Sequence, residues 1–368
     1  MPLTISAIKN DKESHIDIVV PPGENFEKDC AFIEKLIVLE NDELDENDFK
    51  TLRSKPFYKV QEGVYRIIFN LFVIEKIFKG VYFLLRDVND NLPADIKIPD
   101  LKSFFGNEFS EKILLYKILE SIYHDKCTKF SGQELTNMKI DGAPDYYIRK
   151  GKNILLFESK DFLIKADKKQ SFDFNIFEEE FQRILYYENL SSGKVKRKAV
   201  KQLANSIRKI LKKEFYTDTK YFCKDIFIYP ILLTHDSQYD VLGFNYLVNY
   251  WFQKEIEILK NEGLFIYHIR PLVVVNIDAL IFHQIGLSDT IPLHDVLKLY
   301  IDQINVKLIS KFKTFKEYKD GLSHLIPFSI FIDKYFHKKG INKIMPILDS
   351  LEPALFKEEF EKNKLHIN

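Results

Sequence analysis

Residues 142–160 read GAPDYYIRKGKNILLFESK, and they are the most informative segment of this 368-residue chain. Two apolar runs flank Gly151-Lys152, which fits a two-residue β-turn with glycine at its first central position. Such a turn fixes the register of the two strands and places Asp145 directly opposite Glu158. Their Cβ atoms would then lie roughly 4.5–5.5 Å apart. The segment therefore predicts a hairpin in which two acidic residues face each other.

Two facing carboxylates repel each other unless a positive charge neutralises them, and a divalent cation does this well. Mg²⁺ binds through few protein carboxylates and leaves positions for waters and phosphate oxygens, as phosphodiester hydrolysis requires. Lys160 shares a face of its strand with Glu158 because strand side chains alternate. It could orient the attacking water or stabilise charge that develops on the phosphate. The pattern predicts a metal-dependent centre at Asp145, Glu158 and Lys160.

Pro144-Asp145, followed after thirteen residues by Glu158-Ser159-Lys160, resembles the PD-(D/E)xK nuclease superfamily, whose members include restriction and recombination endonucleases. The resemblance spans residues of about 104 to 280. It implies an α/β fold, with a restriction-endonuclease-like core of a mixed central sheet flanked by helices. It also implies a Mg²⁺-dependent endonuclease in which Mn²⁺ can substitute, serving bacterial restriction or anti-phage defence. Asp145, Glu158 and the main-chain carbonyl of Ser159 would be metal ligands.

Two further residues follow from the same resemblance. A helix ahead of the hairpin often supplies another acidic metal ligand in that superfamily, and Glu111 is the best match because apolar residues follow at 114, 115, 118 and 122. Alternatively, Glu111 is a surface residue in the first turn of the helix, where its negative charge interacts favourably with the helix dipole. Some branches place a glutamine on a later helix, and Gln202 is similarly placed. Ser206 stands where an aromatic partner is common, so a catalytic or a substrate-holding role for Gln202 stays open.

Three regions follow from the hydrophobic patterns. Residues 1–98 are predicted to be β-rich, with strands at 15–20, 35–40, 64–69 and 81–86. Residues 99–285 form the nuclease-like core, and residues 286–368 form a helical region with helices near 293–304 and 330–336. Within the core, beside the hairpin, we expect a helix at 109–123, a polar helical stretch at 173–190, a basic helix at 194–213, and buried strands at 225–234 and 271–278.

Charge is balanced over the chain, with 54 Lys+Arg and 54 Asp+Glu. Net charge therefore does not indicate a polyanionic partner, and any nucleic-acid affinity must come from a local patch. The predicted basic helix is the candidate: it is either a solvated face or a contact to the nucleic-acid backbone. We expect DNA rather than RNA as the partner. The nine cations of this helix are Lys194, Lys196, Arg197, Lys198, Lys201, Arg208, Lys209, Lys212 and Lys213.

Several classes of protein are excluded. The three cysteines are scattered and form no C-x-x-C pair, which argues against a disulfide framework and a structural zinc site and favours the cytoplasm. No signal peptide is evident, and the apolar run 65–85 carries Asn70, Glu75, Lys76 and Lys79, so no membrane association is expected. No phosphate-binding G-x-x-x-x-G-K-[ST] loop is present. His235-Asp236 follows a buried strand and could be a catalytic dyad. Because the side chains of adjacent residues usually point in different directions, we interpret the two as ordinary polar loop residues.

Other interpretations remain open. Glu158 and Lys160 could form a same-face surface ion pair, although the run ILLF ahead of them indicates a strand buried on both faces. The chain could also be a catalytically silent nucleic-acid-binding module of the same fold. A protein-interaction scaffold is a third class, suggested by zero net charge and many aromatic residues. A homodimer or partner proteins would be compatible with each of them.

Overall fold

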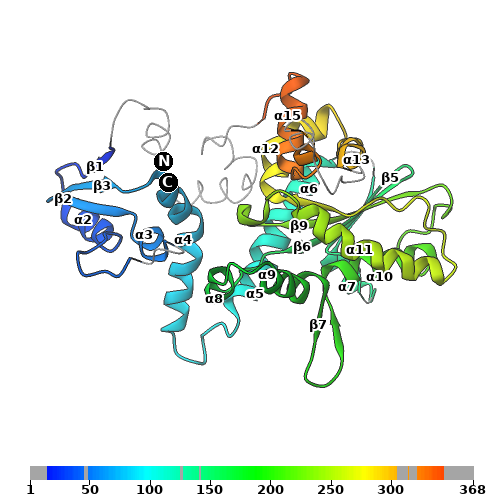
Figure 1. Cartoon of the computed structure of the whole chain (residues 1–368), viewed down its shortest axis with the longest axis horizontal. Coiled ribbons are helices and arrows are strands. Elements are labelled where there is room, and N and C mark those ends of the chain that lie inside the picture. The colour runs from blue at the N-terminus through cyan, green and yellow to red at the C-terminus, as the bar shows by residue number, and fades with distance from the viewer. Residues whose placement is uncertain are drawn as a thin grey trace, which may run out of the picture. The chain divides into compact units, whose positions relative to one another are not determined.

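The computed structural model describes residues 15–44, 49–124, 127–140, 142–304, 314 and 321–343. The chain forms two compact units, which are residues 1–101 with 165–172 and residues 102–164 with 173–368. Figure 1 labels their elements along the chain. The last part of the predicted helical region, residues 344–368, lies outside the described residues.

The larger unit is built on a five-stranded mixed sheet in the order β10-β9-β6-β5-β4. Strands β4, β5 and β6 are antiparallel, whereas β6, β9 and β10 are parallel. The predicted hairpin and both predicted buried strands are confirmed, and the protein is of the mixed α/β class. The strands are β4 (Thr128–Ser131), β5 (Tyr146–Lys150), β6 (Asn153–Lys160), β9 (Phe227–Thr234) and β10 (Val273–Asn276).

Helices cover both faces of this sheet. One face packs against α9 (Phe174–Phe181), the π-helical η2 (Gln182–Tyr186), α10 (Ala199–Leu211) and α11 (Phe244–Asn261). The other packs against the π-helical η1 (Gly106–Leu115), α6 (Tyr116–Ile122), α12 (Ile277–Asp289), α13 (Leu293–Ile304) and α15 (Phe328–Lys338). The C-terminal region is therefore helical, as predicted, and its helices complete the hydrophobic core. Shorter elements are α5 (Leu101–Phe105), α7 (Gly132–Asn137) and the 3-10 helix η3 (Ser237–Tyr239).

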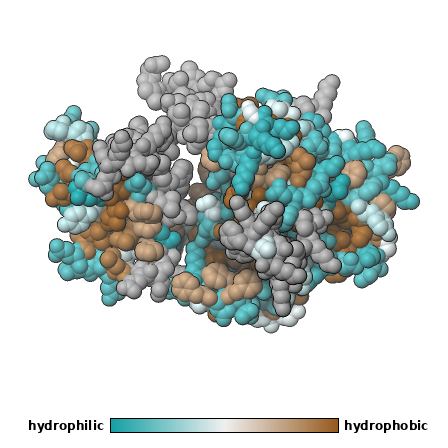
Figure 2. All heavy atoms as spheres, turned by 45° about the horizontal axis from the view of Figure 1, so that its top comes forward, coloured by the Kyte–Doolittle hydropathy of each residue, from teal (hydrophilic) through white to brown (hydrophobic). Residues whose placement is uncertain are grey.

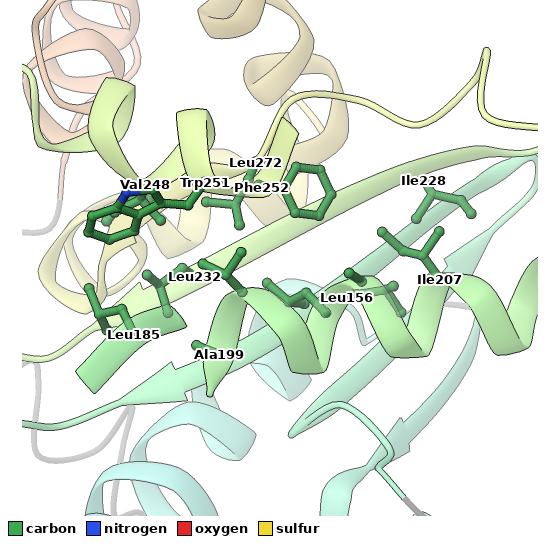
Figure 3. Close-up of a cluster of buried hydrophobic side chains, with 14 of the residues drawn as sticks. Leu156, Leu185, Ala199, Ile207, Ile228, Leu232, Val248, Trp251, Phe252 and Leu272 are labelled. Atoms are coloured by element: carbon green, nitrogen blue, oxygen red, sulfur yellow. The ribbon is translucent and has the colours of Figure 1, made fainter. Parts of the chain in front are cut away.

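Burial of β6 on both faces explains why four apolar residues precede Glu158-Ser159-Lys160. Ile154 and Leu156 belong to the core on the α10 side, whereas Leu155 and Phe157 belong to the core on the α6 side. Figure 3 shows Leu156 in the buried cluster beside α10, at a position between Leu232 and Ile207. A strand covered on both faces needs apolar residues at every position. Glu158 and Lys160 are therefore unusual, because they are charged residues at the end of a strand in which the four residues before them are apolar and buried.

The predicted basic helix begins later than expected. Residues 195–197 form strand β8 (Val195–Arg197), which pairs with β7 (Tyr187–Asn189) as a separate two-stranded ribbon. Gly193 has φ +76 and allows the tight turn between the two strands. Lys198 is extended and the helix starts at Ala199. The predicted helical stretch at 173–190 ends earlier than expected, at Tyr186, because the chain becomes extended at Tyr187.

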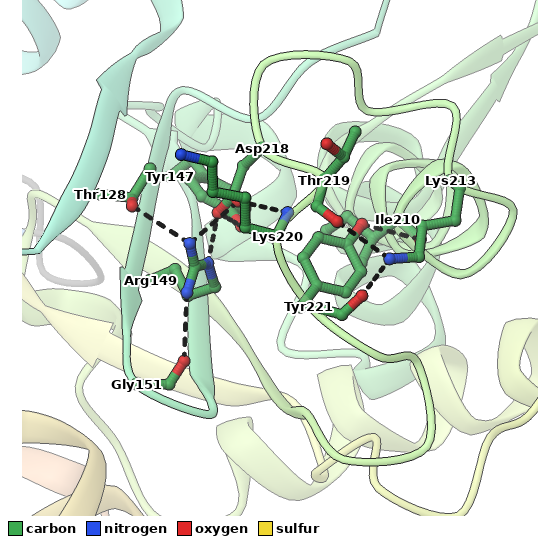
Figure 4. A network of polar contacts seen from close by, with 10 residues as sticks. All are labelled: Thr128, Tyr147, Arg149, Gly151, Ile210, Lys213, Asp218, Thr219, Lys220 and Tyr221. Atoms are coloured by element: carbon green, nitrogen blue, oxygen red, sulfur yellow. Dashed lines mark hydrogen bonds and ion pairs between the residues drawn. The ribbon is translucent and has the colours of Figure 1, made fainter.

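A buried polar network fixes the turn end of the hairpin. Asp218 accepts hydrogen bonds from Tyr147 Oη at 2.9 Å and from Arg149 Nη2 at 3.0 Å, and Arg149 Nη2 also reaches Thr128. Figure 4 shows these side chains converging from β4, β5 and the loop after α10. Because a buried carboxylate is stable only when paired, this network ties the α10–β9 connection to the sheet.

The smaller unit has a three-stranded antiparallel sheet in the order β1-β3-β2, formed by β1 (Asp17–Val19), β2 (Phe57–Gln61) and β3 (Val64–Ile67). Its helices are α2 (Phe26–Glu34), α3 (Lys50–Ser54), α4 (Asn70–Asp90) and α8 (Ala166–Gln170). The predicted strand at 81–86 is wrong, because these residues lie in α4. At 35–40 only an isolated bridge forms, between Ile37 and Phe57. The region is therefore α+β rather than β-rich, since a short apolar run does not distinguish a strand from a buried helix segment.

The surface is mixed in polarity. Figure 2 shows hydrophilic side chains over much of the larger unit and a concentration of apolar side chains on the smaller one. Exposed apolar residues of the smaller unit include Phe32, Phe49, Phe69, Leu84 and Val88. Among the described residues, no helix has the length and apolar character needed to cross a membrane.

Candidate active site

The β5–β6 hairpin has the predicted register. Gly151, with φ +60, and Lys152 form the turn, and the paired residues run from Lys150 with Asn153 to Tyr146 with Phe157. Asp145 is the residue before β5, so it lies opposite Glu158. The main-chain N–H of Ser159 donates to Asp145 Oδ2 at 2.7 Å. The side chain of Asp145 is thus held across the end of β6.

Gly132 fixes the backbone of Asp145 from the other side. Its N–H donates to the main-chain oxygen of Asp145 at 2.7 Å. A Cβ atom at residue 132 would lie only 3.0 Å from that oxygen and 3.1 Å from Asp145 Cα. Helix α7 starts at Gly132 behind a capping box formed by Ser131 and Glu134. The absence of a side chain at position 132 therefore permits the close approach of α7 to Asp145.

Glu158 is fully buried and only half satisfied. Lys160 Nζ donates to Glu158 Oε1 at 2.8 Å, while Oε2 is buried without a hydrogen-bond partner among the described residues. Burial and the carboxylate of Asp145 raise the pKa of Glu158 to about 8, although Lys160 opposes them. Burial alone would lower the pKa of Lys160, but Glu158 and Asp145 outweigh it and raise that pKa. The lysine is therefore a cation whose side chain is about 25% exposed beside a buried carboxyl group.

Glu111 belongs to the same electrostatic cluster. It lies in η1 and accepts a hydrogen bond from Tyr116 Oη at 2.8 Å. Burial and Asp145 raise the pKa of Glu111 to about 7, against the effect of the Tyr116 hydrogen bond. Burial also raises the pKa of Asp145, while Lys160 and the N–H of Ser159 lower it. The helix predicted at 109–123 is confirmed, but its first part is π-helical, a geometry that often occurs at functional sites.

Asp161, just beyond β6, anchors the helix that carries Glu111. It accepts hydrogen bonds from Ser110 Oγ at 2.8 Å and from Lys102 Nζ at 2.5 Å. Ser110 is buried and directly precedes Glu111 in the chain. The end of β6 and η1 are consequently held together by a charge-assisted hydrogen bond. Sequence reasoning missed Asp161, although its position directly after Lys160 is a signal that could have been considered.

His235 is a second residue that sequence reasoning did not place here. Its Nε2 lies 2.7 Å from Ser159 Oγ, because β9 runs parallel to β6 and pairs Leu233 with Ser159. Burial lowers the pKa of His235 to about 4, so the imidazole is neutral at pH 7. Asp236 instead accepts from the N–H of Gln238 and caps η3. The two side chains diverge, as expected, but His235 contacts the residue between Glu158 and Lys160.

Gln202 lies on α10, which packs against the sheet. Ser206, one turn later, donates from Oγ to the main-chain oxygens of Gln202 and Gly142 at 3.1 and 3.2 Å. Gly142 precedes Asp145 by three residues, so this helix supports the loop that leads into β5. The structure brings together Asp145, Glu158, Lys160 and Glu111, and it records no hydrogen bond between the described side chain of Gln202 and any of them. Its role stays a prediction.

Most cations of the predicted basic helix have internal partners. Lys201 Nζ and Tyr186 Oη both donate to the buried Glu255, at 2.8 and 2.9 Å. Lys198 pairs with Glu188 at 2.8 Å, and Arg208 makes a two-pronged contact with Glu262. Lys213 donates to the main-chain oxygens of Thr219 and Tyr221. These contacts tie α10 to α11 and to neighbouring loops and leave fewer charges for a polyanion than the sequence indicates.

The chemistry of the site fits a hard divalent cation. Its donors are carboxylate oxygens, and one of them, Glu158 Oε2, is buried with no hydrogen-bond partner in the residues that the structure describes. Burial has raised the pKa of Glu111, Asp145 and Glu158. In the described part of the chain, however, no three His, Cys, Asp or Glu side chains are already arranged to hold a metal ion. Lys160 Nζ donates to Glu158 Oε1, and the N–H of Ser159 donates to Asp145 Oδ2, so one oxygen of each carboxylate already has a partner. Metal binding would therefore require displacement of these contacts.

Comparison of the chain with protein-family models, curated proteins and solved structures found no match.

Proposed function

We propose that the protein is a Mg²⁺-dependent endonuclease with a restriction-endonuclease-like core, acting on DNA in preference to RNA. The observation that carries the proposal is the burial of Glu158, opposite Asp145 and paired with Lys160, with one carboxylate oxygen left without a partner among the described residues. Burial of an ionisable group is costly and perturbs its pKa, and such groups cluster at functional sites. The sequence resemblance to the PD-(D/E)xK superfamily supports the same assignment.

Asp145, Glu158, Glu111 and the main-chain carbonyl of Ser159 would hold the cation. When bound, Mg²⁺, or Mn²⁺ in its place, would supply Lewis-acid stabilisation of the charge that builds on the phosphodiester. Glu158, which keeps its proton at neutral pH without a cation, would release that proton on binding one. With a pKa of about 8, Glu158 keeps its proton at neutral pH unless a cation is near, whereas Glu111, with a pKa of about 7, is already partly ionised there.

Lys160 and Glu111 have separate roles in the proposed reaction. Lys160 remains protonated and would donate to a phosphate oxygen as negative charge develops there. Glu111 would serve as a ligand of the cation, with its carboxylate oriented by the hydrogen bond from Tyr116 Oη. Asp145 would be oriented by the N–H of Ser159. We further propose a cytoplasmic role in bacterial restriction or anti-phage defence, which rests on the family resemblance alone.

A catalytically silent nucleic-acid-binding module of the same fold is the second candidate. It is favoured by the ion pair between Lys160 and Glu158, which occupies one of the two carboxylate oxygens. In a silent module this pair would be permanent, and the protein would bind nucleic acid without any dependence on Mg²⁺. The two candidates therefore differ in metal binding as well as in cleavage.

The test is incubation of the purified protein with supercoiled plasmid, linear duplex, single-stranded DNA and RNA, each with Mg²⁺, Mn²⁺ or EDTA. We expect cleavage with either metal, none in EDTA, and none with Glu158→Gln. Glu257→Gln, which removes an exposed carboxylate on α11, is the matched control and should cleave normally. Binding without cleavage under every metal condition would instead identify the silent module.

A further inference from the structure

The β7–β8 ribbon, defined as residues 187–197, is a narrow two-stranded element outside the central sheet. Its turn is closed by hydrogen bonds from Leu190 N to Lys194 O and from Gly193 N to Leu190 O, each 2.9 Å long. Figure 1 shows β7 and the strand after it extending away from the rest of the larger unit as a hairpin. The ribbon therefore offers both of its faces to a partner.

The ribbon carries positive charge that the fold does not neutralise. Lys194, Lys196 and Arg197 are exposed, and in the part of the chain that the structure describes none of them has a carboxylate partner within ion-pair distance. Arg197 donates to the side-chain oxygen of Asn205 at 3.4 Å, a neutral partner. The one acid of the ribbon, Glu188, is paired with Lys198 and Arg183 at its base. This contrasts with α10, where Lys201 and Arg208 are paired with glutamates of α11 and its C-cap.

The ribbon leaves the fold at the end of the sheet that holds the candidate active site. Figure 3 shows Ala199 at the same end as Leu185 and Leu232, and Ile207 at the opposite end near Ile228, so α10 runs antiparallel to β9. Leu232 is the register partner of Glu158. Since β8 directly precedes α10, the base of the ribbon lies toward the end of β6 that carries Glu158 and Lys160.

We propose that the β7–β8 ribbon binds double-stranded DNA, with its turn and β8 cations contacting phosphates beside the scissile bond. This inference rests on the proposed nuclease function and specifies its substrate. A two-stranded β-ribbon fits the major groove of B-DNA, which is about 12 Å wide, whereas the major groove of A-form RNA is too narrow to admit it. Exposed Lys and Arg contribute affinity by releasing counterions from the phosphates.

The experiment compares wild type with a triple variant, Lys194→Gln, Lys196→Gln and Arg197→Gln. Binding to a labelled DNA duplex, to its single strand and to an RNA duplex is measured by fluorescence anisotropy in EDTA at several salt concentrations. A matched control, Lys298→Gln, Lys334→Gln and Lys338→Gln, removes three exposed lysines from α13 and α15. Cleavage by wild type is measured separately with Mg²⁺.

We expect the ribbon variant to bind duplex DNA at least about tenfold more weakly, with the slope of log K against log salt reduced by roughly 2–3, while the control matches wild type. An unchanged affinity and slope in the ribbon variant would overturn the inference, as would wild-type binding to single strands or RNA that is as tight as to duplex DNA. Loss of duplex binding in the ribbon variant, with no cleavage by wild type, would reject the nuclease and keep the ribbon as a DNA-binding element. Cleavage by wild type, with DNA binding by the ribbon variant unchanged, would keep the nuclease and reject the ribbon as a DNA-binding element.

Discussion

Asp145 and Ser159 are joined by a hydrogen bond of 2.7 Å from the main-chain N–H of Ser159 to Asp145 Oδ2. The bond sets the direction of an acidic side chain that would otherwise be free to turn from Glu158. Ser159 Oγ in turn lies 2.7 Å from His235 Nε2. Ser159, between Glu158 and Lys160, therefore links the ends of β5, β6 and β9.

Glu158→Ala and Asp145→Ala should each abolish cleavage, because each removes a proposed metal ligand. Neither should unfold the protein, since each removes a carboxyl group whose pKa is raised by burial and whose ionisation therefore destabilises the folded state. Thermal melting in EDTA should show a Tm at or above that of wild type. Cleavage at the wild-type rate by either purified variant would exclude these residues from the active centre.

Lys160→Ala should reduce the cleavage rate by about 10²–10³-fold, the range for loss of one group that stabilises the transition state. Loss of the lysine also removes a charge that favours ionised Glu158, so the Glu158 pKa in the variant should rise above its wild-type value of about 8. Mg²⁺ titrations should therefore compare both proteins at several pH values up to 9, and the Mg²⁺ affinity of the variant should approach that of wild type as the pH rises. If affinity falls together with the rate at every pH, Lys160 has a structural role.

Stability in EDTA should fall as the pH rises from about 5 to about 9. The pKa of Glu158 is raised from 4.5 to about 8 in the folded protein, so the folded state keeps a proton that the unfolded state has lost. This contribution is complete below pH 4.5 and disappears as the pH passes 8. Urea unfolding across this range should show a smaller loss for Glu158→Gln than for wild type; parallel curves for the two proteins would contradict the raised pKa.

Gly132→Ala should impair the site through the backbone of Asp145. The new Cβ would lie 3.0 Å from Asp145 O, which has little freedom to move because it accepts the Gly132 N–H. We expect a loss of about 1–3 kcal/mol in stability, as for overpacking of a core, and reduced cleavage. Gly23→Ala, which meets no atom within 4 Å, is the control and should do neither. Wild-type activity in Gly132→Ala would show that the position of Asp145 tolerates this displacement.

Lys201→Ala should weaken folding rather than DNA binding. Lys201 and Tyr186 both donate to Glu255, which is only 6% exposed, and removal of Lys201 takes away the cation that pairs with this carboxylate. Because Lys201 itself is partly exposed, we expect about 1–2 kcal/mol from urea denaturation, less than for a fully buried pair. Lys212→Ala, from a longer and more exposed pair with Glu262, should change stability little. A large loss of DNA affinity with unchanged stability would restore α10 as a phosphate-binding helix.

The sequence alone determined the hairpin and its acidic pair. Gly151-Lys152 admits a tight turn, and once the turn is fixed the alternation of side chains places Asp145 opposite Glu158. The apolar run of β6 likewise implied burial on both faces, which the two cores confirm. These features are local, so each depends on residues within about twenty positions of one another.

Tertiary structure decided the remaining features, because they depend on contacts between distant segments. His235 meets Ser159 across 76 residues only because β9 lies parallel to β6. Lys198, Lys201 and Arg208 are paired with Glu188, Glu255 and Glu262. Glu255 lies in α11 and Glu262 is its C-cap, so no pattern within α10 could reveal these two pairings. Residues 81–86 form part of a helix rather than a strand, since a short apolar run satisfies either geometry until its neighbours are placed.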